Sequence, residues 1–156
     1  MRALDALVGS IVRAGSWLAL PIAALLFMQW PLREVLQRFS REANDLGQIC
    51  FALYVAIALT AASRRGTHLA TDVFAHRYSQ RTRRVLLRIV ALVAVAPWCI
   101  FVLWSGLDIA VRSIRLLEGF PDTFNPGYFA IKGAMCLLAA LLLVQTLVDF
   151  FAPRRQ

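Results

Sequence analysis

The sequence predicts an all-α integral membrane protein with four transmembrane helices, short interfacial amphipathic helices and both termini in the cytoplasm. The chain has 156 residues and is 60% hydrophobic, whereas soluble domains are typically about 45–50% apolar. Its charged residues gather between four apolar runs, each long enough to cross the ~30 Å core of a bilayer. Arginines crowd the segment 64–84 between the second and third runs. Because Arg and Lys concentrate in cytoplasmic loops, this segment sets the orientation of a single membrane domain, residues 1–156.

The first predicted span covers about residues 11–30, with Pro21 as an expected kink. Its apolar run is longer than the core of a signal peptide, so we expect an uncleaved helix. The next segment, 32–41, has apolar residues at positions 32, 35, 36 and 39 and charged residues on the other face. This spacing predicts an amphipathic helix that lies flat in the membrane interface.

The second predicted span covers about residues 46–62, and we expect Asn44 or Asp45 to cap it. Three small residues spaced four apart, Ala52, Ala56 and Thr60, follow one face of this helix. Small residues allow two helices in a membrane to approach closely. We therefore interpret this stripe as a candidate partner-packing face, with packing inside the chain as the alternative.

The basic segment that follows predicts a second interfacial helix at about 72–82, capped by Thr71 or Asp72. Arginines on its outer side and at the start of the third span are placed to contact anionic lipid headgroups. These candidate headgroup contacts are Arg77, Arg81, Arg84 and Arg88.

The third predicted span covers about 85–107, with Pro97 as a possible kink site. Helical spacing continues beyond it to a stop at Gly119-Phe120-Pro121, and Asp108 is positioned to pair with Arg112 one turn later. The last span covers about 128–151, directly after Pro126-Gly127.

Composition and spacing exclude several classes of function. The net charge of +8 comes from arginines that flank apolar runs, so it indicates membrane topology and not a nucleic-acid surface. The sequence shows no phosphate-binding loop and no nucleophile–base pair, and it predicts no enzyme, no cofactor and no metal site. Four helices without a polar pathway point to the partner of a larger protein. The alternatives are a membrane anchor of a redox enzyme and a small homo-oligomeric channel or exporter.

One motif carries a family resemblance. The second span ends in Arg64-x-Gly66-x-His68-x-x-x-Asp72, followed by a basic stretch and a third span. Together with the four-helix layout, this pattern resembles the DctQ family, the small permease subunit of tripartite ATP-independent periplasmic (TRAP) transporters. The likeness extends from the first span to Phe151. Leu69 and Thr71 replace the branched aliphatic residues that are usual beside the motif His and Asp.

The resemblance implies a subunit of the bacterial inner membrane. In such a transporter a large permease subunit carries the substrate and sodium sites, and a periplasmic solute-binding protein delivers an organic acid or related solute. The small subunit braces the large one and has no catalytic residue. On this interpretation the motif residues order the cytoplasmic turn, since Gly66 allows a bend and Asp72 caps the next helix. A direct contact of this loop with the large subunit is the alternative.

Overall fold

The structure, a computed structural model, describes residues 2–35, 41–64, 79, 82, 85–86 and 89–151. In chain order its helices are α1 Arg2–Ser16, α2 Ala19–Glu34, α3 Arg41–Arg64, the π-helical turn η2 Ala91–Val95, α5 Ala96–Arg115 and α6 Tyr128–Phe151. Four helical stretches in this part of the chain are long and apolar enough to cross a membrane. The predicted all-α fold with four spanning helices is therefore confirmed.

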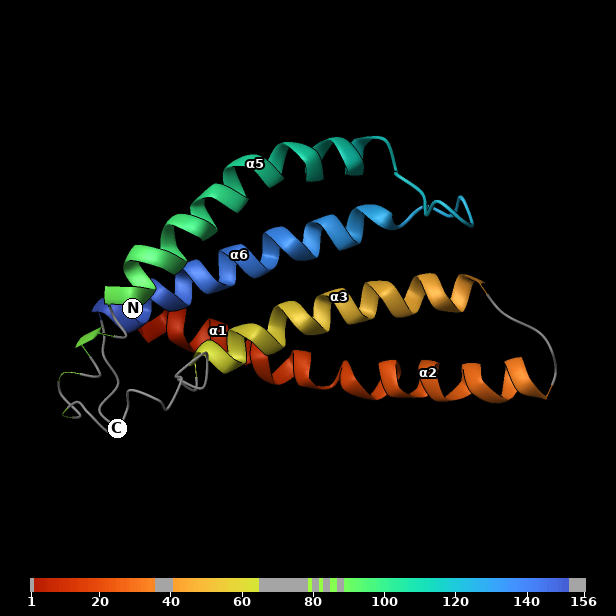
Figure 1. Cartoon of the computed structure of the whole chain (residues 1–156), viewed down its shortest axis with the longest axis horizontal. Helices are drawn as coiled ribbons and strands as arrows, with labels where there is room; N and C mark the ends of the chain where they lie inside the picture. The colour runs from red at the N-terminus through yellow and green to blue at the C-terminus, as the bar shows by residue number, and fades with distance from the viewer. Residues whose placement is uncertain are drawn as a thin grey trace.

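The spans lie side by side in an open layer (Figure 1). Helix α6 lies between α5 and α3, α2 lies along the other side of α3, and α1 contacts both α3 and α6 (Figure 1). Of the most apolar stretch of each span, 44% of α6 is buried inside the protein but only 11–17% of the other three. The core accordingly centres on α6, where Ala139 and Leu142 pack against Cys99 of α5. The outer helices leave most of their apolar surface uncovered by the chain itself.

The layer has two distinct ends. Helix α1 begins and α6 ends at one of them, which we call the terminal end (Figure 1). The loop 116–127, which joins α5 to α6, lies at the opposite end, which we call the loop end (Figure 1). An even number of crossings between the start of α1 and the end of α6 produces this arrangement.

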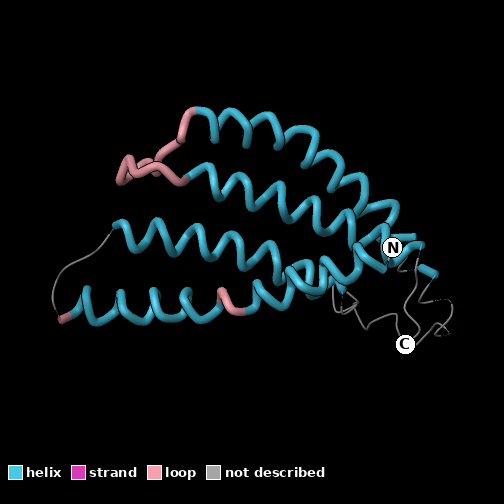
Figure 2. Tube along the Cα trace, turned by 180° about the vertical axis from the view of Figure 1, so that it is seen from behind, coloured by secondary structure: helices cyan, strands magenta, loops and turns pink. Residues whose placement is uncertain are grey.

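The first span is longer than the predicted 11–30 and is interrupted. Helix α1 begins at Arg2, and a short break at residues 17–18 separates it from α2, visible as a loop in Figure 2. Pro21 explains the position of this break. It has no N–H to donate to the carbonyl of Trp17, which accepts instead from the N–H of Leu20 at 3.2 Å, a tighter turn. The effect of Pro21 therefore appears one turn before the proline.

The connection to α3 differs from prediction in one respect. Residues 32–34 of the predicted interfacial helix continue α2, and residues 36–40 lie outside the described part of the chain, so a separate interfacial helix there stays a prediction. Helix α3 begins at Arg41, so the expectation that Asn44 or Asp45 caps it is wrong. Both residues lie inside the helix, where Asp45 is buried and accepts a hydrogen bond from Thr123.

The third span contains a π-helical turn where a kink was expected. The N–H of Ala96 donates to the carbonyl of Ala91, five residues earlier, and Pro97 follows directly. A residue without an N–H weakens the regular α-helical ladder at this point, and a wider turn accommodates the mismatch.

Helix α5 continues past the predicted span limit of residue 107 and ends at Arg115, before the predicted stop at Gly119. Leu117 has a positive φ of 46°. Its N–H donates to the carbonyl of Ile114 at 3.1 Å, and the N–H of Glu118 donates to Ser113 at 3.0 Å. These two bonds form a Schellman motif, which closes the helix. Helix α6 spans Tyr128–Phe151, the same bounds as the predicted fourth span.

Candidate partner-binding surfaces

Arg64, the first residue of the predicted motif, joins the end of α3 to α1. Its Nη1 lies 3.2 Å from Oδ1 of Asp5 and donates to the backbone carbonyl of Asp5 at 2.8 Å. The guanidinium lies over Gly9, where an added Cβ would be 3.0 Å from Nη2. Sequence reasoning missed Asp5; the only signal available was an acid near the start of the chain. Arg64 thus connects two helices that are distant in sequence.

The other predicted residues of this region lie outside the described part of the chain. They are Gly66, His68 and Asp72 of the motif, the headgroup candidates Arg77, Arg81, Arg84 and Arg88, and most of the predicted helix 72–82. Their roles stay predictions.

The predicted partner-packing stripe of α3 is largely covered by the chain itself. Ala56 and Thr60 are buried, and the Thr60 hydroxyl donates to the carbonyl of Ala56 at 2.9 Å. Ala52 is half-buried. Packing inside the chain, the alternative given above, accounts for the first two residues. A partner contact at Ala52 stays a prediction.

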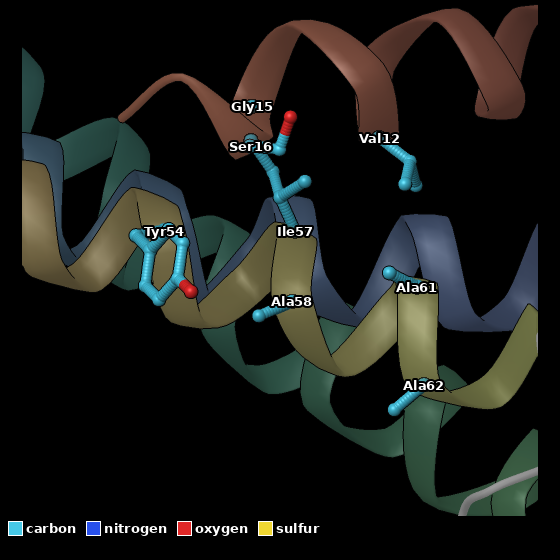
Figure 3. Close-up of a pocket in the computed structure, with 8 residues that line it drawn as sticks. All are labelled: Val12, Gly15, Ser16, Tyr54, Ile57, Ala58, Ala61 and Ala62. Atoms are coloured by element: carbon cyan, nitrogen blue, oxygen red, sulfur yellow. The ribbon is translucent and has the colours of Figure 1, made fainter. Parts of the chain in front are cut away.

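A groove between α1 and α3 offers a second face of α3. It has a volume of about 270 Å³ and is lined by Val12, Gly15 and Ser16 of α1 and by Tyr54, Ile57, Ala58, Ala61 and Ala62 of α3. Figure 3 shows the side chain of Ile57 directed toward Gly15 across the groove. Ala58 and Ala62 repeat the small-xxx-small spacing one face away from the predicted stripe. That spacing was the signal that could have located this surface.

Polar contacts hold the loop end together. The Glu118 carboxylate accepts from Lys132 Nζ at 2.5 Å and from the hydroxyl of Ser113. The hydrogen bond and charge of Lys132, together with the Ser113 hydroxyl, lower the pKa of Glu118. These contacts attach the loop to α5 and α6, while the Thr123 hydroxyl donates to Asp45 Oδ2 of α3 at 2.5 Å.

The predicted Asp108–Arg112 pair is wrong, because the ion pairs of the described residues do not include one between them.

The described residues offer no candidate metal site. They contain no group of three or more His, Cys, Asp or Glu side chains that could hold a metal ion. The three free cysteines, Cys50, Cys99 and Cys136, occur on three different helices. What this part of the chain offers is apolar helix surface, a groove between α1 and α3, and polar contacts between helices.

Comparison with known proteins identifies the family. The model of the "Tripartite ATP-independent periplasmic transporters, DctQ component" family matches residues 22–156, well over half of the chain. The chain belongs to the DctQ family. The resemblance seen in the sequence is thereby confirmed, and the matched range includes the motif from Arg64 to Asp72. No match was found among curated proteins or among solved structures.

Family membership defines the general role of this DctQ chain. It is the small permease component of a TRAP transporter, a multi-pass membrane protein of a transport system and not an enzyme. Transporters of this family generally have three components, including a large permease and a periplasmic binding protein.

Proposed function

We propose that this chain is the non-catalytic bracing subunit of a sodium-coupled transporter in the bacterial inner membrane. It binds the large permease subunit, which takes up an organic acid or related solute delivered by the periplasmic binding protein. The observation that supports this proposal best is the open layer of spans. Only α6 is substantially covered by its own chain, whereas the other helices leave long apolar faces available to lipid and to a partner.

Internal ties make the layer suitable as a brace. Arg64 fastens α3 to α1 at the terminal end, and Glu118 and Asp45 fasten the loop to three helices at the loop end. Helix α3 thus has a tie at each end, through Arg64 and Asp45, which resists its sliding against its neighbours. A brace needs this property when a neighbouring transport domain moves.

The groove between α1 and α3 is the proposed contact with the large subunit. Ala58, Ala61 and Ala62 leave room for a second helix to approach α3 closely. Van der Waals packing of this kind drives helix association inside a membrane, where the hydrophobic effect between helices is absent. A transmembrane helix of the large subunit is therefore the proposed occupant of the groove.

The proposed orientation places both termini in the cytoplasm. It follows from the arginine-rich segment 64–84. In this orientation the terminal end faces the cytoplasm and the loop end faces the periplasm. The motif residues Arg64, Gly66, His68 and Asp72 then order the cytoplasmic turn, and Arg77, Arg81, Arg84 and Arg88 contact headgroups.

Co-purification with photo-crosslinking tests this function. In a chain with its three native cysteines replaced by alanine, Ala61→Cys carries a benzophenone label into the groove, and Phe101→Cys carries it to the exposed face of α5. The tagged chain, co-expressed with the large permease and extracted in mild detergent, should retain that permease and crosslink to it from position 61 but not from position 101. A chain that purifies alone and transports solute by itself in liposomes would refute the subunit function.

A further inference from the structure

Arg13 is a charged residue inside the first membrane-spanning stretch. It lies in α1, within the stretch Ala3–Leu32 that is long and apolar enough to cross a membrane. Its side chain is exposed, and it forms neither an ion pair nor a hydrogen bond with any of the described residues. An ionised side chain in a membrane-spanning segment is costly without a partner, so such residues usually mark a functional contact.

Two contacts between α1 and α3 fix the depth of Arg13 in the layer. The guanidinium of Arg64 lies over Gly9, and the side chain of Ile57 lies against Gly15. Arg13 is two residues from the second of these contacts. It is four residues from the first, which places it about 6 Å further from the terminal end than the guanidinium of Arg64. The backbone of Arg13 is therefore level with the apolar run of α3 and not with the charged end of that helix.

Arg64 occupies the direct route along α1 by which Arg13 would reach lipid headgroups. Long side chains on a helix extend over the preceding turn, so an arginine at position 13 would normally snorkel past Gly9 toward the terminal end. The guanidinium of Arg64 already lies there, since its Nη2 would be 3.0 Å from a Cβ on Gly9. Its like charge disfavours a second guanidinium, and the carboxylate of Asp5 is already paired with Arg64 at 3.2 Å. A counter-charge for Arg13 therefore has to come from another molecule.

Arg13 borders the groove between α1 and α3. Ser16, which lines the groove, follows Arg13 by three positions and is its neighbour on the surface of α1. The hydroxyl of Ser16 donates to the backbone carbonyl of Arg13 at 2.7 Å. Apart from Ser16 and Tyr54, the residues that line the groove are apolar or small. A helix that fills this groove thus meets an apolar surface with one positive charge at its edge.

We propose that the helix of the large permease that fills the groove carries a carboxylate, from Asp or Glu, which pairs with Arg13. This inference rests on the proposed function, which assigns the groove to that helix. In the proposed orientation the terminal end faces the cytoplasm, so the carboxylate lies in the cytoplasmic half of the membrane. A helix without it would shield the guanidinium from water and headgroups with no compensating charge, which weakens binding. The pair therefore selects the partner helix and sets its position along the groove.

Charge reversal tests the pair. The tagged chain is co-expressed with the large permease and extracted in mild detergent, and the amount of permease retained per chain is measured. Arg13→Glu should reduce this amount by about tenfold, because it places two carboxylates together where a pair of opposite charges was. Arg112→Glu is the matched control. Arg112 is an exposed arginine of α5, at the other edge of the layer (Figure 1), and its reversal should leave the retained amount unchanged.

A compensating change in the permease identifies the carboxylate. Each Asp and Glu in the cytoplasmic half of the permease's transmembrane helices is changed in turn to Arg and co-expressed with the Arg13→Glu chain. One of these changes should restore retention of the permease by Arg13→Glu and should weaken its retention by the parent chain. Arg13→Gln is the second variant, for the case that Arg13→Glu does not insert into the membrane. It should also weaken retention, and changing the same acid to its amide should restore it, because neither partner is then left unpaired.

The remaining outcomes contradict the inference in distinct ways. If the Arg13 variants retain as much permease as the parent chain does, Arg13 is not at the contact. If they retain less but no change of an acid in the permease restores retention, the counter-charge is a lipid phosphate and not a carboxylate. In both cases the parent chain still retains the permease, so the proposed function stands and only this inference fails. A parent chain that retains no permease overturns both.

Discussion

Gly15 of α1 lies so close to Ile57 of α3 that a Cβ added to the glycine would be 2.4 Å from Cδ1 and 2.5 Å from Cγ2 of the isoleucine. Real side-chain atoms do not approach to such distances, and a β-branched side chain has few alternative rotamers with which to yield. The close approach of these two helices therefore depends on the absence of a side chain at position 15.

Gly15→Ala is expected to separate α1 from α3 and to destabilise the protein by about 1–3 kcal/mol, the usual cost of overpacking. Gly106→Ala is the matched control. Its added Cβ would meet the terminal methyl of Met135 at 2.9 Å, and a flexible methionine can move aside. Thermal unfolding in detergent, followed by tryptophan fluorescence, should show a clearly lower midpoint for Gly15→Ala than for Gly106→Ala. Equal midpoints would mean that α1 and α3 are not packed as the structure shows.

The contact between Arg64 and Asp5 should contribute to stability through the coupling of the two side chains. Asp5→Asn is expected to cost about 1 kcal/mol, because the pair is partly exposed and solvent screens it. Asp108→Asn, a change of the same kind at an exposed acid of α5, should cost nothing measurable. A double-mutant cycle with Arg64→Met isolates the coupling. A coupling of zero would show that Arg64 is held only by the carbonyl of Asp5.

Sequence patterns predicted the spans well where sharp signals bound an apolar run. Pro126-Gly127 precedes α6, and its predicted bounds match the structure. The start of the first span was predicted less well. Helix α1 extends back to Arg2 through Asp5 and Arg13, whose charges hide its helical character in a hydropathy pattern. Local pattern alone cannot show that Asp5 has a basic partner 59 residues later.

The candidate surfaces were harder to predict than the helices. The stripe Ala52, Ala56 and Thr60 has the correct spacing for helix packing, but spacing cannot tell whether the neighbouring helix belongs to the same chain. Burial of Ala56 and Thr60 inside the layer is a result of how α3 is rotated about its axis. That rotation depends on contacts with distant segments, such as the Asp45–Thr123 hydrogen bond.

The stability of the loop end should decrease in acid because of Glu118. Lys132 and Ser113 lower the pKa of this carboxyl group in the folded protein. A lowered pKa means that the folded state favours the ionised carboxylate. The contribution of this carboxylate to the free energy of unfolding is therefore complete above the ordinary glutamate pKa of about 4.3, and it is lost as the pH falls through the lowered pKa. Unfolding midpoints measured between neutral and acidic pH should converge for the parent chain and Glu118→Gln at the acidic end. If the midpoints of the two proteins keep the same separation at every pH, ionisation of Glu118 does not stabilise the folded protein.

Leu117 ends α5 in the left-handed region, where glycine is normally favoured. Leu117→Gly should therefore stabilise the isolated chain by up to about 1 kcal/mol, the strain relieved minus the added freedom of the unfolded chain. Leu116→Gly is the matched control. Leu116 has an ordinary φ of −88° and is similarly exposed, so glycine there should only destabilise. Thermal midpoints that move in the same direction for both changes would refute the strain.

Gln145 is fully buried in α6, and neither polar atom of its amide has a hydrogen-bond partner in the structure as described. An unsatisfied buried amide costs about 1–3 kcal/mol, so an apolar side chain of similar length should remove that cost. Gln145→Met is expected to raise the unfolding midpoint of the chain. Gln145→Ala also removes the amide but leaves a cavity, so it should give a lower midpoint than Gln145→Met. If Gln145→Met destabilises the chain as much as Gln145→Ala does, the amide has a polar partner in the folded protein.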